Sequence, residues 1–235
     1  MRIDIAETSP KERNGDTVHV AVRELKEETY RALKWAGYSW GQSQSMGRMV
    51  GLVEIIWGSG ISSGLADIKR RFIKKRSPHL TWSSHGVLLS TKGLSVPMAA
   101  SFAVALSQSK PGLKVFVKGS DYGPEVAAAV WDTKVHPNRT ISWGICRDSQ
   151  QNDYSVVPNG DLMMHERLQS VEPAMSRDKD LWFVTCHEAR ISGEVIMDKK
   201  VQVGKMSDAW VEGVKVSKAE WEKLTAFSMK YLVPE

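Results

Sequence analysis

Cysteine is scarce in this chain, with only Cys146 and Cys186 among 235 residues. The two lie far apart and lack CxxC spacing, so we expect reduced core thiols rather than a disulfide or a metal-binding pair. No run of 18 apolar residues occurs, which excludes a transmembrane helix. The segment Met1–Ile5 also lacks the basic start and apolar stretch of a secretory signal. We therefore expect a cytoplasmic protein that has no membrane partner.

Several motifs that define common enzyme classes are also missing. The chain has no Walker loop, no GxGxxG fingerprint and no HExxH pair. His187 and Glu188 are adjacent on an expected strand and point to opposite faces, so no metal site is predicted. The net charge of +5 is concentrated in the basic run 69–76. No nucleic-acid-binding motif accompanies that run, and it fits a solvated helix end or an anion or partner site.

What the chain does contain is a strong helical pattern near its start. Apolar residues recur at helical spacing up to Ala36, and Gly37 follows as a natural C-terminal cap. Ser39 and Gln42 form a capping box that opens a second helix, which Gly58 ends. The sequence thus predicts a helical hairpin. Gly47 and Gly51, four residues apart in the second helix, indicate a close helix crossing in preference to a ligand site.

The remaining elements alternate between helix and strand. We expect a helix from residue 62, two short strands within 79–93, helices from 97 and 124, and strands at 113–117 and 140–145. Residues 181–188 and 191–197 fit neighbouring strands, 152–161 and 170–180 fit polar loops, and the chain ends in a helix. The predicted class is mixed α/β: an N-terminal helical hairpin packed on an α/β layer with additional β-strands and a C-terminal helix. Residues 1–16 are predicted to form a leader or edge segment, and 17–235 a single α/β domain with a helical part at about 22–76.

One turn stands out as a candidate site. Asp121 lies between an expected strand and the first turn of a helix, where free backbone N–H groups could hold an anion. Its carboxylate could act as a base, or it could cap the helix from 124 to 131. Arg48 is a second candidate, because its guanidinium could pair with an anionic ligand or with an acidic residue of a partner chain.

Two segments carry a resemblance to known families. The string 32–41, Ala-Leu-Lys-Trp-Ala-Gly-Tyr-Ser-Trp-Gly, and the tail strings 221–227 and 231–234 resemble the two ends of a bacterial domain family of unknown function. More distantly, the first two thirds is similar to the non-Rossmann malate/L-lactate/sulfolactate dehydrogenase family. In that family a helical hairpin leads into a Ser-His-Gly-Val-x-Arg segment, and a later Ser-x-His-Phe/Tyr-Gly turn carries the catalytic histidine.

This chain departs from the family pattern at the catalytic positions. In the first motif Ser62 and Gly64 match, but Ser63 replaces the histidine and Asp67 the substrate-binding arginine. In the second motif Tyr122 and Gly123 match, whereas Asp121 replaces the histidine and Gly119 the serine. His85, in Ser84-His85-Gly86-Val87, repeats the first string about twenty residues downstream. The chain also ends about a hundred residues before that family does and lacks its glycine-rich cofactor segment.

The resemblance implies an oligomer, of identical or different chains, that binds a small-molecule ligand. The first functional hypothesis is an enzyme, or enzyme subunit, acting on a small polar, anionic metabolite by non-redox chemistry, hydrolytic or eliminative. Its predicted catalytic residues are Asp121 and His85, and its predicted substrate-binding residues are Arg48, Ser62, Ser63, Ser120 and Tyr122. Two alternatives stay open: an NAD(P)-dependent oxidoreductase of keto acids or imines, and a non-catalytic subunit that completes another chain's active site. No cofactor is predicted under the first hypothesis, and NAD(P) is the cofactor of the second.

Overall fold

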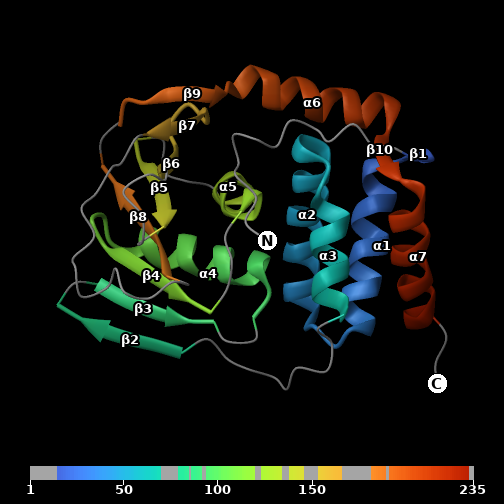
Figure 1. Cartoon of the computed structure of the whole chain (residues 1–235), viewed down its shortest axis with the longest axis horizontal. Helices are drawn as coiled ribbons and strands as arrows, with labels where there is room; N and C mark the ends of the chain where they lie inside the picture. Colours follow the sequence, from blue (N-terminus) through green and yellow to red (C-terminus); the bar gives the residue numbers. More distant parts are fainter. Residues whose placement is uncertain are drawn as a thin grey trace. The chain divides into compact units, whose positions relative to one another are not determined.

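The computed structural model describes residues 15–69, 79–84, 86–91, 94–119, 123–133, 138–145, 153–165, 181–188 and 191–232. These residues contain both helices and strands, which confirms the predicted mixed α/β class. By its internal contacts the chain divides into two units (Figure 1). A helical unit comprises Ile3–Lys74 with Lys200–Glu235, and a sheet unit comprises chiefly Lys75–Lys199.

The helical unit joins the beginning of the chain to its end. Its elements are β1 (Thr17–Val20), α1 (Val22–Trp35), α2 (Trp40–Trp57), α3 (Gly60–Lys69), α6 (Lys199–Glu212, which starts at the boundary), β10 (Val214–Ser217) and α7 (Lys218–Leu232). β1 and β10 pair as an antiparallel ribbon. α7 lies alongside α1, where Trp35 stacks on Phe227 with ring centroids 5.1 Å apart (Figure 1). The predicted C-terminal helix is therefore confirmed.

The predicted hairpin of α1 and α2 is also confirmed, together with the residues that shape its turn. Gly37 has φ +93°, a left-handed conformation that a residue with a Cβ adopts only at a cost. Ser39 accepts a hydrogen bond from the Gln42 backbone N–H, and the Gln42 side chain accepts one from the Ser39 N–H. Gly58 ends α2 in the left-handed region, with φ +71°.

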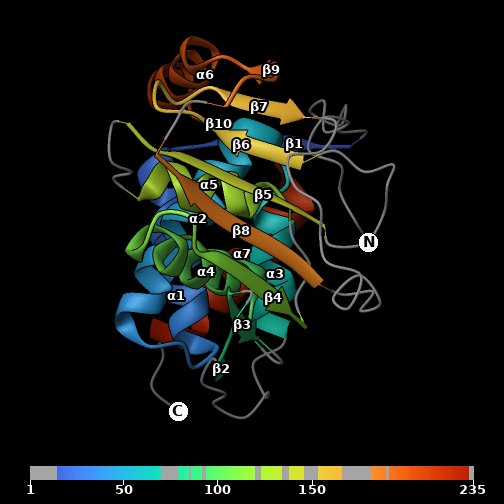
Figure 2. The ribbon, with the colours of Figure 1, turned by 90° about the vertical axis from the view of Figure 1, so that its left-hand side faces the viewer.

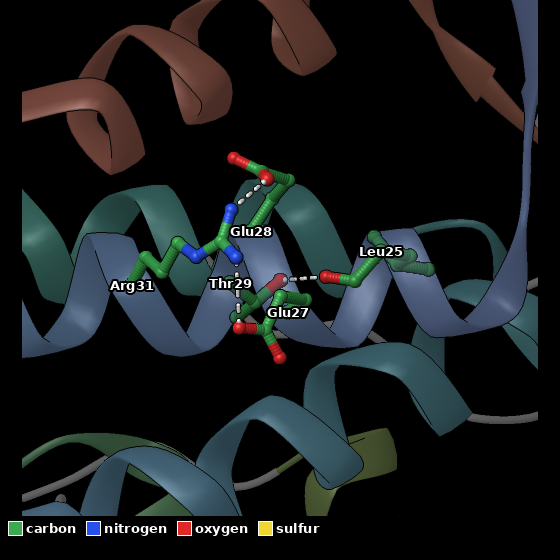
Figure 3. Close-up of polar contacts among 5 residues, drawn as sticks. All are labelled: Leu25, Glu27, Glu28, Thr29 and Arg31. Atoms are coloured by element: carbon green, nitrogen blue, oxygen red, sulfur yellow. Dashed lines mark hydrogen bonds and ion pairs between the residues drawn. The ribbon is translucent and has the colours of Figure 1, made fainter. Parts of the chain in front are cut away.

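Two polar side chains of α1, those of Thr29 and Arg31, find their partners within the same helix (Figure 3). Arg31 pairs with Glu27 at 3.1 Å and with Glu28 at 3.0 Å on the helix surface. Thr29 is fully buried, and its Oγ1 donates a 2.7 Å hydrogen bond to the Leu25 carbonyl of the preceding turn. The buried Thr29 hydroxyl thus has its hydrogen-bond partner in the backbone of its own helix.

Glycines allow the helices of this unit to approach closely. A Cβ added at Gly47 would lie 3.2 Å from the Lys26 carbonyl oxygen of α1. The interpretation of Gly47 and Gly51 as a helix crossing is therefore confirmed. The closest approach is at Gly60, where a Cβ would lie 2.0 Å from the Val50 carbonyl oxygen and 2.6 Å from the Glu54 amide nitrogen.

The sheet unit contains an eight-stranded sheet and two helices. Its elements are β2 (His79–Ser83), β3 (Gly86–Ser90), α4 (Val96–Ser109), β4 (Lys114–Lys118), α5 (Pro124–Asp132), β5 (Thr140–Ile145), β6 (Asp153–Val156), β7 (Leu162–His165), β8 (Leu181–His187) and β9 (Glu194–Met197). The strand order is β2-β3-β4-β8-β5-β6-β7-β9, and only β3 and β4 run parallel.

Two predictions about this unit were wrong. β8 and β9 are not neighbours, because β8 inserts between β4 and β5 while β9 pairs with β7 at the sheet edge. The stretch 152–161 is not wholly a polar loop, because it contains β6. In both cases the pairing partner lies far along the chain, and strand propensity carries no information about it.

One face of the sheet is apolar. Val115, Val184, Trp143 and Tyr154 are register partners across four adjacent strands, and Trp143 stacks on Tyr154. Arg139, on the same side of β5, donates a 3.1 Å hydrogen bond to the Gln108 carbonyl of α4. Helices α4 and α5 both lie on this side of the sheet (Figure 2). The hydrophobic core of the unit therefore forms between this face and the two helices.

We predict that Gly60→Ala lowers the free energy of unfolding by about 1–3 kcal/mol, because its methyl group overlaps backbone atoms that cannot move independently. The measurement is chemical denaturation of the full chain. Gly41→Ala is the matched control: a Cβ there meets nothing within 4 Å, so it should be neutral or stabilising by up to about 1 kcal/mol. Equal stability of the two variants would contradict the predicted close approach.

Candidate active site

The opposite face of the sheet carries a row of polar side chains next to an apolar cluster formed by Leu88, Phe116, Leu181 and Phe183. We call the side of the sheet that holds this row the polar face. Lys114 of β4, Thr185 of β8, Ser142 of β5 and Ser155 of β6 are register partners in turn, so their side chains share this face. Thr185, Ser142 and Ser155 are each no more than 1% exposed. We call these four residues, with His165 of β7, the polar stripe.

The stripe ends in a serine–histidine pair. Ser155 Oγ lies 2.7 Å from His165 Nε2, and His165 Nδ1 lies 3.0 Å from the carbonyl oxygen of Ser192. A carbonyl can only accept, so Nδ1 carries the proton and donates to Ser192. Nε2 is then the basic nitrogen, and it accepts a hydrogen bond from the Ser155 hydroxyl. A hydroxyl, an imidazole and a carbonyl that orients the imidazole are therefore in contact, an arrangement that can activate a hydroxyl.

Burial keeps the imidazole of His165 in its basic form. Desolvation lowers the pKa of His165 below 6.5, and the Ser192 carbonyl opposes this shift only in part. The pKa of His187 on β8 is lowered by the same cause, with smaller contributions from the charges of His165 and Lys114. Both side chains are neutral at physiological pH, as a general base must be.

Two glycines make room for the polar groups on this face. A Cβ at Gly193 would lie 2.4 Å from both Nδ1 and Cε1 of His165, so the ring packs directly on the backbone there. A Cβ at Gly144 would lie 1.9 Å from Asp153 Oδ1. The Asp153 carboxylate therefore lies over Gly144, the next residue of β5 on this face after Ser142.

Three polar atoms of this face have no hydrogen-bond partner among the residues that the structure describes. They are Thr140 Oγ1, Ser142 Oγ and His187 Nε2, and each is buried. Thr140 and His187 are register partners, and Ser142 follows Thr140 on the same side of β5. Unpartnered polar groups are uncommon inside proteins, so this cluster is a candidate for contact with a ligand.

The residues predicted from the sequence fall into two groups. His85, Ser120, Asp121 and Tyr122 lie outside the described residues, as do Cys146 and most of the basic run, and the roles given to these four stay predictions. The others belong to the helical unit. Arg48 is exposed on α2, Ser63 is half-buried on α3, and exposed Ser62 donates its hydroxyl hydrogen bond to Glu220 of α7. Their proposed part in substrate binding also stays a prediction.

Among the described residues, no three His, Cys, Asp or Glu side chains gather as a metal ion requires. A pocket of about 130 Å³ beside α5 is lined by Trp131, Arg139, Val156 and Gly160, among others. Ligand pockets usually hold roughly 300–1,000 Å³, so this one does not fit a nicotinamide dinucleotide. None of the described helices has the length and apolar character that a membrane crossing needs.

Comparison with solved structures places the fold among dehydrogenase-like proteins. The chain superposes on malate dehydrogenase from Entamoeba histolytica with a TM-score of 0.62 at 10% identity, covering 94% of this chain and 99% of the other. It superposes on sulfolactate dehydrogenase from Methanocaldococcus jannaschii with a TM-score of 0.61 at 6% identity, covering 92% and 98%. For delta1-piperideine-2-carboxylate reductase from Pseudomonas syringae the TM-score is 0.52 at 9% identity, covering 89% and 99%.

These likenesses establish the fold, which is that of the malate/lactate/sulfolactate dehydrogenase-like proteins. No family model matches the sequence, and no curated protein matches it either. Membership of the bacterial family of unknown function therefore stays a prediction. The alignments reach 97–99% of the malate and sulfolactate dehydrogenase chains.

Sequence reasoning missed the Ser155–His165 pair although its signal was present. Alternation in β5 and β6 places Ser142 and Ser155 on one face and apolar residues on the other, whereas β8 is apolar apart from Thr185 and His187. Such alternation ordinarily indicates a solvent-exposed polar face. Only the tertiary structure shows that this face is buried.

We predict that the folded protein loses stability as the pH falls below about 6.5. The unfolded chain binds protons at the ordinary histidine pKa, whereas His165 and His187 take them up only at lower pH in the folded state. The contribution of the two neutral histidines to the free energy of unfolding is thus fully present above pH 6.5. It is lost as the pH falls from 6.5 to the lower pKa that these histidines have in the folded state. The measurement is the free energy of unfolding between pH 8 and 5.

The double variant His165→Gln with His187→Gln should show a flatter pH dependence in this window. The control is His79→Gln, which removes a histidine that is exposed on β2 and should leave the dependence unchanged. An unchanged slope in the double variant would rule out the two buried imidazoles as its source.

Proposed function

We propose that this chain is an enzyme, or a subunit of one, that acts on a small, negatively charged polar metabolite by non-redox chemistry, hydrolytic or eliminative. The observation that carries the proposal is the buried hydrogen bond between Ser155 Oγ and His165 Nε2. A serine hydroxyl held against a neutral imidazole of fixed tautomer is set up for proton transfer.

The roles follow from the directions of the hydrogen bonds. In a hydrolysis, His165 Nε2 removes the Ser155 hydroxyl proton as the serine oxygen attacks an electrophilic carbon, and it returns that proton to the leaving group as the bond to that group breaks. A water molecule, deprotonated by the same nitrogen, then cleaves the serine–carbon bond, and the proton returns to Ser155. In an elimination, Nε2 takes a substrate proton while the bond to the leaving group breaks and a double bond forms, with Ser155 positioning the substrate. The Ser192 carbonyl keeps the proton on Nδ1 throughout, which is the orienting part that a carboxylate has in serine–histidine–aspartate enzymes.

A negatively charged substrate is supported by two observations. Lys114 belongs to the polar stripe, and its charge contributes to lowering the pKa of His187, so a positive potential acts on this face. The structures of similar fold are named for malate, sulfolactate and a piperideine carboxylate, all of which are small acids. Fold likeness alone is an analogy, so the charge on the sheet face is the stronger support.

The first test is turnover of small carboxylic esters, amides and hydroxy acids by the full chain. We predict that Ser155→Ala and His165→Gln each lower kcat/KM by roughly 10²–10⁴ relative to the unmodified protein. Ser109→Ala is the control, because its hydroxyl is exposed at the end of α4 and bonds only its own helix. The acid limb of the pH–rate profile should lie below the ordinary histidine pKa and should disappear in His165→Gln.

If Ser155→Ala and His165→Gln keep full activity, the pair is structural and the proposed chemistry is wrong. If no substrate is turned over and the protein purifies with another chain, the third hypothesis, a non-catalytic partner subunit, is favoured instead.

An NAD(P)-dependent oxidoreductase of keto acids or imines is the second candidate, and the dehydrogenase and reductase names of the fold neighbours favour it. When bound, the cofactor supplies a hydride. The pocket beside α5, at about 130 Å³, is too small for this cofactor.

We expect no change in thermal unfolding of the full chain with millimolar NADH or NADPH under the non-redox proposal. A cofactor present at 100 times its dissociation constant would stabilise the protein by roughly 2.7 kcal/mol and raise the midpoint measurably. AMP at the same concentration is the control for unspecific nucleotide effects. A saturable shift with either dinucleotide, and not with AMP, would favour the oxidoreductase.

A further inference from the structure

Buried hydroxyls in this chain differ in whether the protein itself supplies a partner. Thr29 donates to the Leu25 carbonyl (Figure 3), and Ser107 in α4 donates a 2.8 Å hydrogen bond to the Val104 carbonyl. The Thr140 and Ser142 hydroxyls are equally buried, at 0% exposure, and have no hydrogen-bond partner among the described residues. The Ser43 and Ser228 hydroxyls of the helical unit share that property, so Thr140 and Ser142 are distinguished by their place beside His187 and Ser155. In a strand the backbone carbonyls are used by the ladder, so a hydroxyl has no carbonyl of a preceding turn to bond.

The unpartnered atoms of the polar face lie next to one another and next to the serine–histidine pair. Thr140 is the register partner of His187, and Ser142 is that of Ser155. Side chains opposite each other in antiparallel strands have Cβ atoms about 4.5–5.5 Å apart. A group that bonds to Ser142 therefore lies within reach of the Ser155 hydroxyl.

The character of these atoms favours a negatively charged ligand. The Thr140 and Ser142 hydroxyls supply two donors, and the His187 imidazole supplies a third in the tautomer that carries its proton on Nε2. Lys114 is the register partner of Thr185, which lies two residues before His187 on β8. Its positive charge contributes to lowering the pKa of His187. The one carboxylate that the described residues place beside the cluster, that of Asp153, lies over Gly144 and has partners of its own.

We propose that Thr140, Ser142 and His187 bind the anionic group, a carboxylate or a phosphate, of the substrate on which the Ser155–His165 pair acts. This inference rests on the proposed function, and it assigns the recognition of the charge to residues other than Arg48. Three convergent donors satisfy an oxyanion that has lost its water, and the oxyanion in turn satisfies three buried groups that otherwise have no partner.

The test uses two isosteric substitutions, Thr140→Val and Ser142→Ala, in the full chain. Thermal unfolding is followed with increasing sodium malonate or potassium phosphate, against sodium chloride at equal ionic strength. The unmodified protein should show a saturable rise in Tm with at least one of the two anions. Each variant should raise the apparent Kd by roughly tenfold or more, as the loss of a hydrogen bond to a charged group implies.

The same variants should raise the Tm measured without anion, because each removes a buried hydroxyl that has no partner. Ser107→Ala is the matched control. It removes a buried hydroxyl that is satisfied, so it should lower the Tm and leave the anion response intact. A merely structural role for Thr140 and Ser142 would give the behaviour of Ser107→Ala, and that result would overturn the inference.

The inference also fails if neither anion stabilises the unmodified protein beyond chloride, or if both variants keep its response. Ser155→Ala separates this failure from that of the proposed function. Retained anion binding with lost turnover in Ser155→Ala supports both proposals. Loss of the anion response in Thr140→Val together with full turnover in Ser155→Ala supports the anion site and overturns the proposed chemistry.

Discussion

The structure depends on one constraint: the eight-stranded sheet is buried on both faces along its central strands. A strand sends alternate side chains to opposite faces, and in β5 and β6 one set is apolar and the other polar, while β8 adds Thr185 and His187 to the polar set. The apolar set packs with α4 and α5 at low cost. The polar set has lost water and must find partners within the molecule. Ser155 and His165 partner each other, whereas Thr140, Ser142 and His187 do not.

That constraint links stability to chemistry. Burial lowers the pKa of His165 and so preserves a neutral base, and the contact with Gly193 and the Ser192 carbonyl fixes its ring. The same burial leaves three unpartnered groups that reduce stability unless a ligand satisfies them. Sites that bind and react commonly retain such local costs, because a group already satisfied by the protein is not available to a substrate.

The elements of the helical unit could be predicted from the sequence because their determinants are local. The capping box of Ser39 and Gln42, the left-handed glycines 37 and 58 and the glycines at the α1–α2 crossing act within a few residues or along one helix face. The strand order of the sheet could not be predicted as well, because its pairing joins segments that are distant in the sequence. β8 lies between β4 and β5, and β9 joins β7, although the sequence favoured β8 and β9 as neighbours. β6 was taken for a loop because its four residues include Asp153 and Ser155.

By itself, the sequence determined the mixed α/β class, the hairpin and its turn, the C-terminal helix and the resemblance to dehydrogenase-like proteins, since each depends on residues close together or on a recurring pattern. It also determined which strand residues are polar. Only the tertiary structure decided that those residues form one buried face, that Ser155 meets His165, and that Thr140, Ser142 and His187 lack partners. Those facts depend on strand register and on burial, which are set by contacts between segments distant in the chain and leave no mark on any single segment.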